Sequence, residues 1–177
     1  MSRIVVLVLI AACLAPSCGR EERSGARCGP ITVEQIDPDE GHLIGGAAAP
    51  TFLTDPPTSG PHTPGAVVAG RRTEPVPRIV QVSTLETGAV IIQYGASVDP
   101  KPLERLVVEG VVLAPGTGFP DGEVIATGWL RKMTCVAIDI GALGTFIDTV
   151  RGRYGGHGTS TTVRPATPTT PQTTTEG

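Results

Sequence analysis

Residues 89–115, AVIIQYGASVDPKPLERLVVEGVVLAP, read as a strand, a helix and a second strand in succession. Residues 89–94 and 111–115 are β-branched runs with turn residues around them, which predicts a strand at each place. Between them, apolar residues at i, i+3 and i+4 predict a helix that begins near Pro102 and ends at Gly110. A helix between two strands suggests a crossover connection, right-handed if the strands are parallel.

Further elements flank this unit. Residues 79–83 and 123–133 are β-branched or apolar runs, and we predict a strand for the first and a longer strand for the second. A second helix is predicted after Asp139, a plausible N-cap, with Gly155 as its stop signal. Its apolar stripe at helical spacing consists of Leu143, Phe146, Ile147, Val150 and Tyr154.

This order of elements predicts an α+β fold, with a small mixed β-sheet and about two helices packed on it. Residues 40–155 are expected to form one globular domain. Aromatic residues are only 3% of the chain, so the core must consist of Val, Ile, Leu and Ala. Residues 30–78 are rich in Pro and Gly and are expected to cross the sheet as a long ordered loop.

The N-terminus predicts export. Residues 1–18 have a basic residue, a continuous apolar run and then small residues with cysteine, as in a bacterial lipoprotein signal. Lipidation is expected at Cys18 or Cys13. Cys13 fits the lipobox better, whereas Cys18 gives a more normal signal length and leaves an even number of cysteines. An ordinary secretory signal without lipid is the alternative, and residues 19–39 are expected to be a tether.

An exported chain is extracytoplasmic, either anchored to the cell membrane by lipid or secreted. In that compartment Cys28 and Cys135 are expected to form a structural disulfide or to remain two unpaired thiols. There is no Cys-x-x-Cys, which argues against a redox site. The net charge of −3 gives no general attraction for nucleic acid.

Residues 156–177 are rich in Thr, Pro and Gly and have almost no apolar side chains to bury. This composition is typical of a disordered, often O-glycosylated stalk. His157, one of three histidines in the chain, lies in the Gly-rich start of this tail. It is interpreted as a solvated side chain and not as a ligand.

Residues 55–62, DPPTSGPH, are the most constrained loop in the sequence. Prolines fix φ, a Ser-Gly pair supplies a turn, and the final histidine can hold the loop against the sheet through a backbone hydrogen bond. Trp129 is expected to pack under this loop. The loop has no Gly-x-Ser-x-Gly elbow, which argues against a serine hydrolase. The structural loop residues are Pro56, Pro57, Ser59, Gly60, Pro61 and His62.

The same loop, together with STLETG at residues 83–88 and ATGW at residues 126–129, resembles the bacterial domain of unknown function 3105 (DUF3105) family. The resemblance runs from about His42 to Tyr154 and implies architecture more than activity. Family members typically have His-x-Leu-Glu-His-Gly where this chain has residues 83–88. Both histidines of that motif are replaced here, by Ser83 and Thr87.

The resemblance places histidines at His42 and His62, and two histidines with a carboxylate are a familiar zinc or copper ligand set. Two hypotheses follow. In the first, which we favour, the chain is a non-catalytic binding or scaffold domain without a cofactor, and its envelope partner or ligand is unknown. In the second it is a degenerate metal-binding or metal-dependent domain. The second hypothesis predicts that His42, His62 and Glu86 converge within about 4–5 Å to hold a weakly bound ion.

Overall fold

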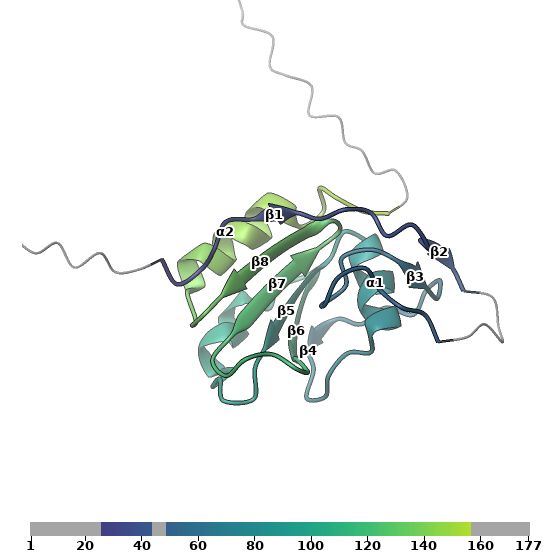
Figure 1. Ribbon diagram of the computed structural model, residues 1–177. Helices are drawn as coiled ribbons and strands as arrows, with labels where there is room; N and C mark the ends of the chain where they lie inside the picture. The colour runs from purple at the N-terminus through teal and green to yellow at the C-terminus, as the bar shows by residue number, and fades with distance from the viewer. Residues whose placement is uncertain (1–25, 44–48, 157–177) are drawn as a thin grey trace, which may run out of the picture.

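The computed structural model describes residues 26–43 and 49–156, which form a mixed six-stranded sheet, a two-stranded sheet and helices (Figure 1). The predicted α+β class is therefore confirmed. The described elements are β1 (Thr32–Val33), β2 (Gly41–His42), β3 (Pro61–His62), β4 (Gly70–Arg71), α1 (Arg78–Glu86), β5 (Val90–Tyr94), the 3₁₀ helix η1 (Lys101–Leu106), β6 (Val111–Pro115), β7 (Val124–Gly128), β8 (Arg131–Cys135) and α2 (Ile140–Val150).

The larger sheet has the strand order β1-β8-β7-β5-β6-β4. Strands β5 and β6 are parallel, as the crossover through η1 requires, and β4 adds to β6 in the same direction. Strands β7 and β8 form an antiparallel hairpin beside β5, and β1 closes that edge. The strand–helix–strand unit in the sequence thus forms the centre of the sheet.

The sheet is covered on both faces, and the alternation along its strands shows which residues lie on each. Val90 and Ile92 of β5 pack with α2 and η1, whereas Ile91, between them, packs with Val82 and Leu85 of α1. These side chains are all fully buried. Successive strand residues point to opposite faces, so α2 and α1 cover opposite sides of the sheet.

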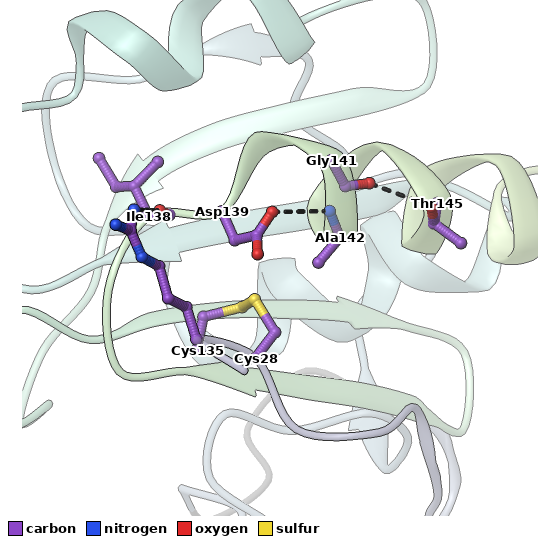
Figure 2. The surroundings of a disulfide bond; sticks show 8 residues. Cys28, Cys135, Ile138, Asp139, Gly141, Ala142 and Thr145 are labelled. Carbon is purple, nitrogen blue, oxygen red and sulfur yellow. Dashed lines mark hydrogen bonds between the residues drawn. A yellow bond between two sulfur atoms is a disulfide. The ribbon is translucent and has the colours of Figure 1, made fainter. Parts of the chain in front are cut away.

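The N-terminal segment is tied to the sheet before β1 begins. Cys28 forms a disulfide with Cys135 at the end of β8, across a sequence separation of 107. Figure 2 shows the bond near the start of α2, where Asp139 accepts a hydrogen bond from the Ala142 N–H. Since β1 also pairs with β8, the ordered domain includes residues 26–39, part of the expected tether.

Three predicted elements differ from the structure. Residues 79–83 lie in helix α1, not in a strand, because Val82 and Leu85, three positions apart on one face of the helix, pack against Ile91 of the sheet. Residues 123–133 form a hairpin, not one strand, because the chain reverses at Trp129 and Leu130. Helix α2 ends at Val150, before the predicted stop at Gly155.

Two other features concern the fold as a whole. The predicted helix between β5 and β6 is the short 3₁₀ helix η1. Within residues 26–43 and 49–156, no helix combines the length and the apolar character needed to cross a membrane.

Candidate metal centre

The two-stranded sheet places two histidines side by side. Strands β2 and β3 are parallel, and their register sets His42 directly opposite His62. The Leu43 N–H extends the pairing by donating to the His62 carbonyl over 2.8 Å. The two imidazole rings lie edge to face, with centroids 5.0 Å apart. A parallel bridge of two residues on each strand therefore brings together side chains that are twenty positions apart in the sequence.

The loop that ends at His62 is buried. Residues 56–62 are all buried, and the bond between Asp55 and Pro56 is a cis peptide bond. The Thr58 carbonyl accepts a hydrogen bond from the Leu130 N–H, which fastens the loop to the turn after β7. Burial and this backbone bond hold the loop against the rest of the domain.

Asp37 organises the loop from within and was not identified from the sequence. Its carboxylate accepts hydrogen bonds from the Leu53 and Asp39 N–H groups, at 2.8 and 3.0 Å. Its own N–H donates to Ser59 Oγ over 2.9 Å. Asp37 is buried, with 4% of the residue exposed. The signal that could have identified it is the sequence Asp-Pro-Asp, because aspartate commonly accepts from the backbone two residues ahead in a turn.

The backbone of Gly60 positions the imidazole ring of His62. Its φ of +129° is a conformation that L side chains rarely adopt, and an added Cβ would lie 3.0 Å from Phe52 Cδ1 and 3.1 Å from Asp37 Oδ2. The Gly60 carbonyl then meets His62 Nδ1 at 2.9 Å. Because a carbonyl oxygen can only accept, Nδ1 carries the proton in this bond. In the neutral imidazole, Nε2 is consequently the nitrogen with a free lone pair.

Glu86, the last residue of α1, completes the cluster. Its Oε2 lies 2.8 Å from His62 Nε2, and its Oε1 lies 3.9 Å from His42 Nε2. One ligand atom from each of the three residues lies within 4.8 Å of the other two. The His62 side chain is 2% exposed and that of Glu86 13%, whereas that of His42 is 49% exposed. The cluster therefore has a buried side and a side open to solvent.

The cluster lines a cavity of about 290 Å³. Trp129, 6% exposed, and Gly156 form part of the wall. Trp129 also packs in one apolar cluster with Phe52, which is consistent with its expected place under the proline-rich loop. A small space with an apolar wall and three convergent polar side chains has the character of a binding site.

The residues that replace the family's histidines do not join the cluster. Ser83 Oγ lies 2.8 Å from the Thr63 carbonyl and 3.0 Å from the Ile79 carbonyl, and Thr87 Oγ1 donates to the Thr84 carbonyl over 2.7 Å. Both hydroxyls are engaged with backbone oxygens.

A larger hollow of about 580 Å³ lies elsewhere, beside the start of α2. Its charged residues are Arg27, Arg105 and Asp139. Both arginines are exposed, and Asp139 caps α2. This hollow has no convergent set of buried polar groups, and the smaller cavity at the histidines is the better candidate for function. The expected lipidation residues Cys13 and Cys18, and His157, lie outside the described residues.

The family model described as "Protein of unknown function (DUF3105)" matches residues 48–163. The chain belongs to this family. The matched region of the DUF3105 domain contains His62 and Glu86, whereas His42 lies six residues before it. No curated protein and no solved structure matches the chain.

Proposed function

We propose that this chain is an extracytoplasmic binding domain whose ligand is a divalent transition metal ion, held by His42, His62 and Glu86. The observation that carries the proposal is the hydrogen bond from His62 Nδ1 to the Gly60 carbonyl, with Nε2 directed at the Glu86 carboxylate. Histidines that bind metal almost always donate their other ring N–H to a carbonyl or carboxylate, which fixes the tautomer and the ring.

The donor set indicates the class of ion. Two imidazole nitrogens and one carboxylate oxygen suit zinc or copper, and they would bind calcium or magnesium poorly. A cation is also favoured by the position of Glu86, because the C-terminal end of a helix carries partial negative charge. The ligand atoms would need only small shifts to reach the usual distances of about 2.0–2.2 Å from one ion.

The proposed location rests on different evidence. The disulfide between Cys28 and Cys135 is of a kind that persists in oxidising compartments. The apolar N-terminus with Cys18 or Cys13 supports a lipid anchor in the cell membrane. In this proposal the domain acts outside the cytoplasm and binds the ion without catalysing a reaction.

A second candidate function is a scaffold domain without metal. It is favoured by the burial of His62 and by its bond to the Gly60 carbonyl, which would hold the loop in place whether or not an ion binds. In that case the cluster is structural, and the ligand of the domain is another envelope component.

Metal content separates the two candidates. The chain from Gly19 onward, which retains every described residue, would be purified without a polyhistidine tag, dialysed against zinc or copper and analysed for bound metal. We expect one equivalent of metal, lost in the variants His42→Ala and Glu86→Gln. His42→Ala is the sharper variant, because its half-exposed side chain contributes little to the core and the metal-free protein should unfold as the parent does.

A parent chain without bound metal, or a His42→Ala variant that retains it, would favour the scaffold. The anchor is tested separately, by mass spectrometry of the N-terminal peptide from cell membranes. Lipid on Cys18 or on Cys13 identifies the acceptor, and an unmodified, released chain would indicate an ordinary secretory signal.

A further inference from the structure

A second carboxylate lies at the rim of the cavity that contains the cluster. Glu40 lines this cavity of about 290 Å³ together with the three proposed ligands. It directly precedes strand β2 and is two positions before His42. Side chains two positions apart along an extended chain point to the same side, and their Cα atoms are about 7 Å apart. The Glu40 carboxylate therefore lies on the same side of the chain as the His42 imidazole.

The Glu40 carboxylate is available to a ligand. The residue is exposed, and no side chain or backbone group of residues 26–43 and 49–156 forms a hydrogen bond or ion pair with its carboxylate. Its backbone is nevertheless held, because the Glu40 N–H donates to the Asp37 carbonyl over 3.1 Å. The start of the side chain is thus fixed beside the cavity, whereas its end can rotate.

We propose that Glu40 is the fourth protein ligand of the metal ion, an inference that rests on the proposed function. The cluster described above supplies three ligands, whereas zinc held by protein alone takes four. Among the described residues that line the cavity, Glu40 is the remaining one with a side chain that commonly binds zinc. Its carboxylate is not one of the atoms that lie within 4.8 Å of one another. It reaches the ion by a change of side-chain rotamer.

The balance of charge supports this assignment. The two imidazoles are neutral when they bind metal, so Glu86 alone would leave a divalent ion with an uncompensated positive charge. A charge in a partly buried site is costly unless it is paired, and a second carboxylate from Glu40 makes the site neutral. No lysine or arginine is among the described residues that line the cavity, so no protein cation competes there for either carboxylate.

A fourth ligand from Glu40 changes the class of the site. Catalytic zinc sites keep one position open for water or substrate, whereas sites with four protein ligands are closed. Glu40 and the half-exposed His42 lie on the side of the cluster that is open to solvent. The ion enters from that side, and Glu40 then closes the site behind it. The result is a site suited to holding an ion and not to activating a bound water.

The test compares the chain from Gly19 onward with its Glu40→Gln variant, and uses Asp39→Asn as the matched control. Asp39 is the neighbouring exposed carboxylate and does not line the cavity, so its variant removes the same charge from outside the site. Zinc affinity would be measured by competition with a chelator. The open position would be tested by adding azide to the cobalt(II)-loaded proteins and recording their visible absorption, because azide binds where water can be displaced from the metal.

We expect Glu40→Gln to bind zinc at least about tenfold more weakly, since loss of even a residue that only orients a ligand costs about 10–100-fold. Asp39→Asn should match the parent chain. Azide should change the cobalt spectrum of Glu40→Gln and leave that of the parent unchanged. The metal-free variant should unfold in urea as the parent does, because the Glu40 side chain is exposed.

A parent spectrum that responds to azide would overturn the assignment of Glu40, and so would equal zinc affinities in Glu40→Gln and Asp39→Asn. Metal loss in His42→Ala would then still support the three-ligand site. If the parent chain binds neither zinc nor cobalt, the proposed function fails together with this inference.

Discussion

The Cys28–Cys135 bond should contribute a large part of the stability of the domain. The bond closes a loop with a sequence separation of 107, which includes every described strand and helix except α2. In the chain-entropy account, opening a loop of about 100 residues costs about 4.7 kcal/mol at 25 °C. Small domains have a total free energy of unfolding of about 5–15 kcal/mol. Loss of the bond should therefore leave the protein close to the limit of folding.

Cys28→Ala is the informative substitution. Cys135 is completely buried in the main core, so replacing it would add a packing defect to the loss of the bond. Cys28 is only partly buried, and the segment around it is also held by backbone bonds from Gly29 N–H to the Thr134 carbonyl and from Val136 N–H to the Arg27 carbonyl. Its replacement removes the crosslink with little other change in the folded state.

Urea unfolding, followed by the fluorescence of Trp129 and by circular dichroism, measures the effect. We expect the free energy of unfolding to fall by about 3–5 kcal/mol in Cys28→Ala, and the denaturant slope to rise because the unfolded chain is no longer crosslinked. The parent protein in reductant should match the variant. A fall of less than about 1 kcal/mol would refute the argument, since the crosslink would then not constrain the unfolded ensemble.

Two further predictions concern single positions. Gly60→Ala should lower the free energy of unfolding by about 1–3 kcal/mol, because a φ of +129° suits only glycine and the added methyl would lie 3.0 Å from Phe52 Cδ1. The same substitution should weaken metal binding, because it shifts the Gly60 carbonyl that holds His62. Gly65→Ala, with φ +74° and open space around it, is the matched control and should leave metal affinity unchanged. Burial lowers the pKa of Lys132 below 10.5 despite the nearby Glu34 carboxylate, so the penalty for its charge is present at neutral pH and disappears as the pH rises through the lowered pKa towards 10.5. The free energy of unfolding, measured by urea unfolding as a function of pH, should therefore rise over that alkaline window in the parent protein and should show no such rise in Lys132→Met. An NMR titration of Lys132 with a midpoint at or above 10.5 would contradict this prediction.

The parts of the fold that the sequence predicted are those in which local pattern and tertiary packing agree. Strands β5 and β6 are β-branched runs, and the helix α2 combines an apolar stripe with a capping aspartate at Asp139. Each of these signals is local, and each residue then packs where its periodicity places it. The central sheet and the helix that covers one face were predictable for this reason.

Helix α1 was missed because packing overrides its composition. Its sequence RIVQVSTLE is rich in residues that favour strands. It is nevertheless a helix, with Val82 and Leu85 buried against Ile91 and Trp129. The reversal at Trp129 and Leu130 was missed for a similar reason: Leu130 adopts a φ of +54° without a glycine or asparagine to indicate a turn. In both places the decisive interactions are with residues far away in the sequence.

The candidate site shows the same limit. The sequence and the family resemblance indicated His42, His62 and Glu86, but no local pattern predicts that a two-residue parallel bridge pairs the two histidines. Asp37 was missed because its role depends on bonds to Leu53 and Ser59, in a loop sixteen and more residues away. Contacts of this kind join residues that are distant in the sequence, so they form only when the whole segment from Asp37 to His62 is folded.

Because α1 is a helix, the effect of replacing the family's two motif histidines by Ser83 and Thr87 can be stated in structural terms. Positions 83, 86 and 87 are spaced i, i+3 and i+4, so they share one helix face. A His-x-x-Glu-His sequence there would present three ligands to the space beside β2 and β3. In this chain Ser83 and Thr87 instead bond to backbone carbonyls, and only Glu86 faces the histidines. The metal site proposed here therefore depends on the two histidines of the β2–β3 pair together with Glu86.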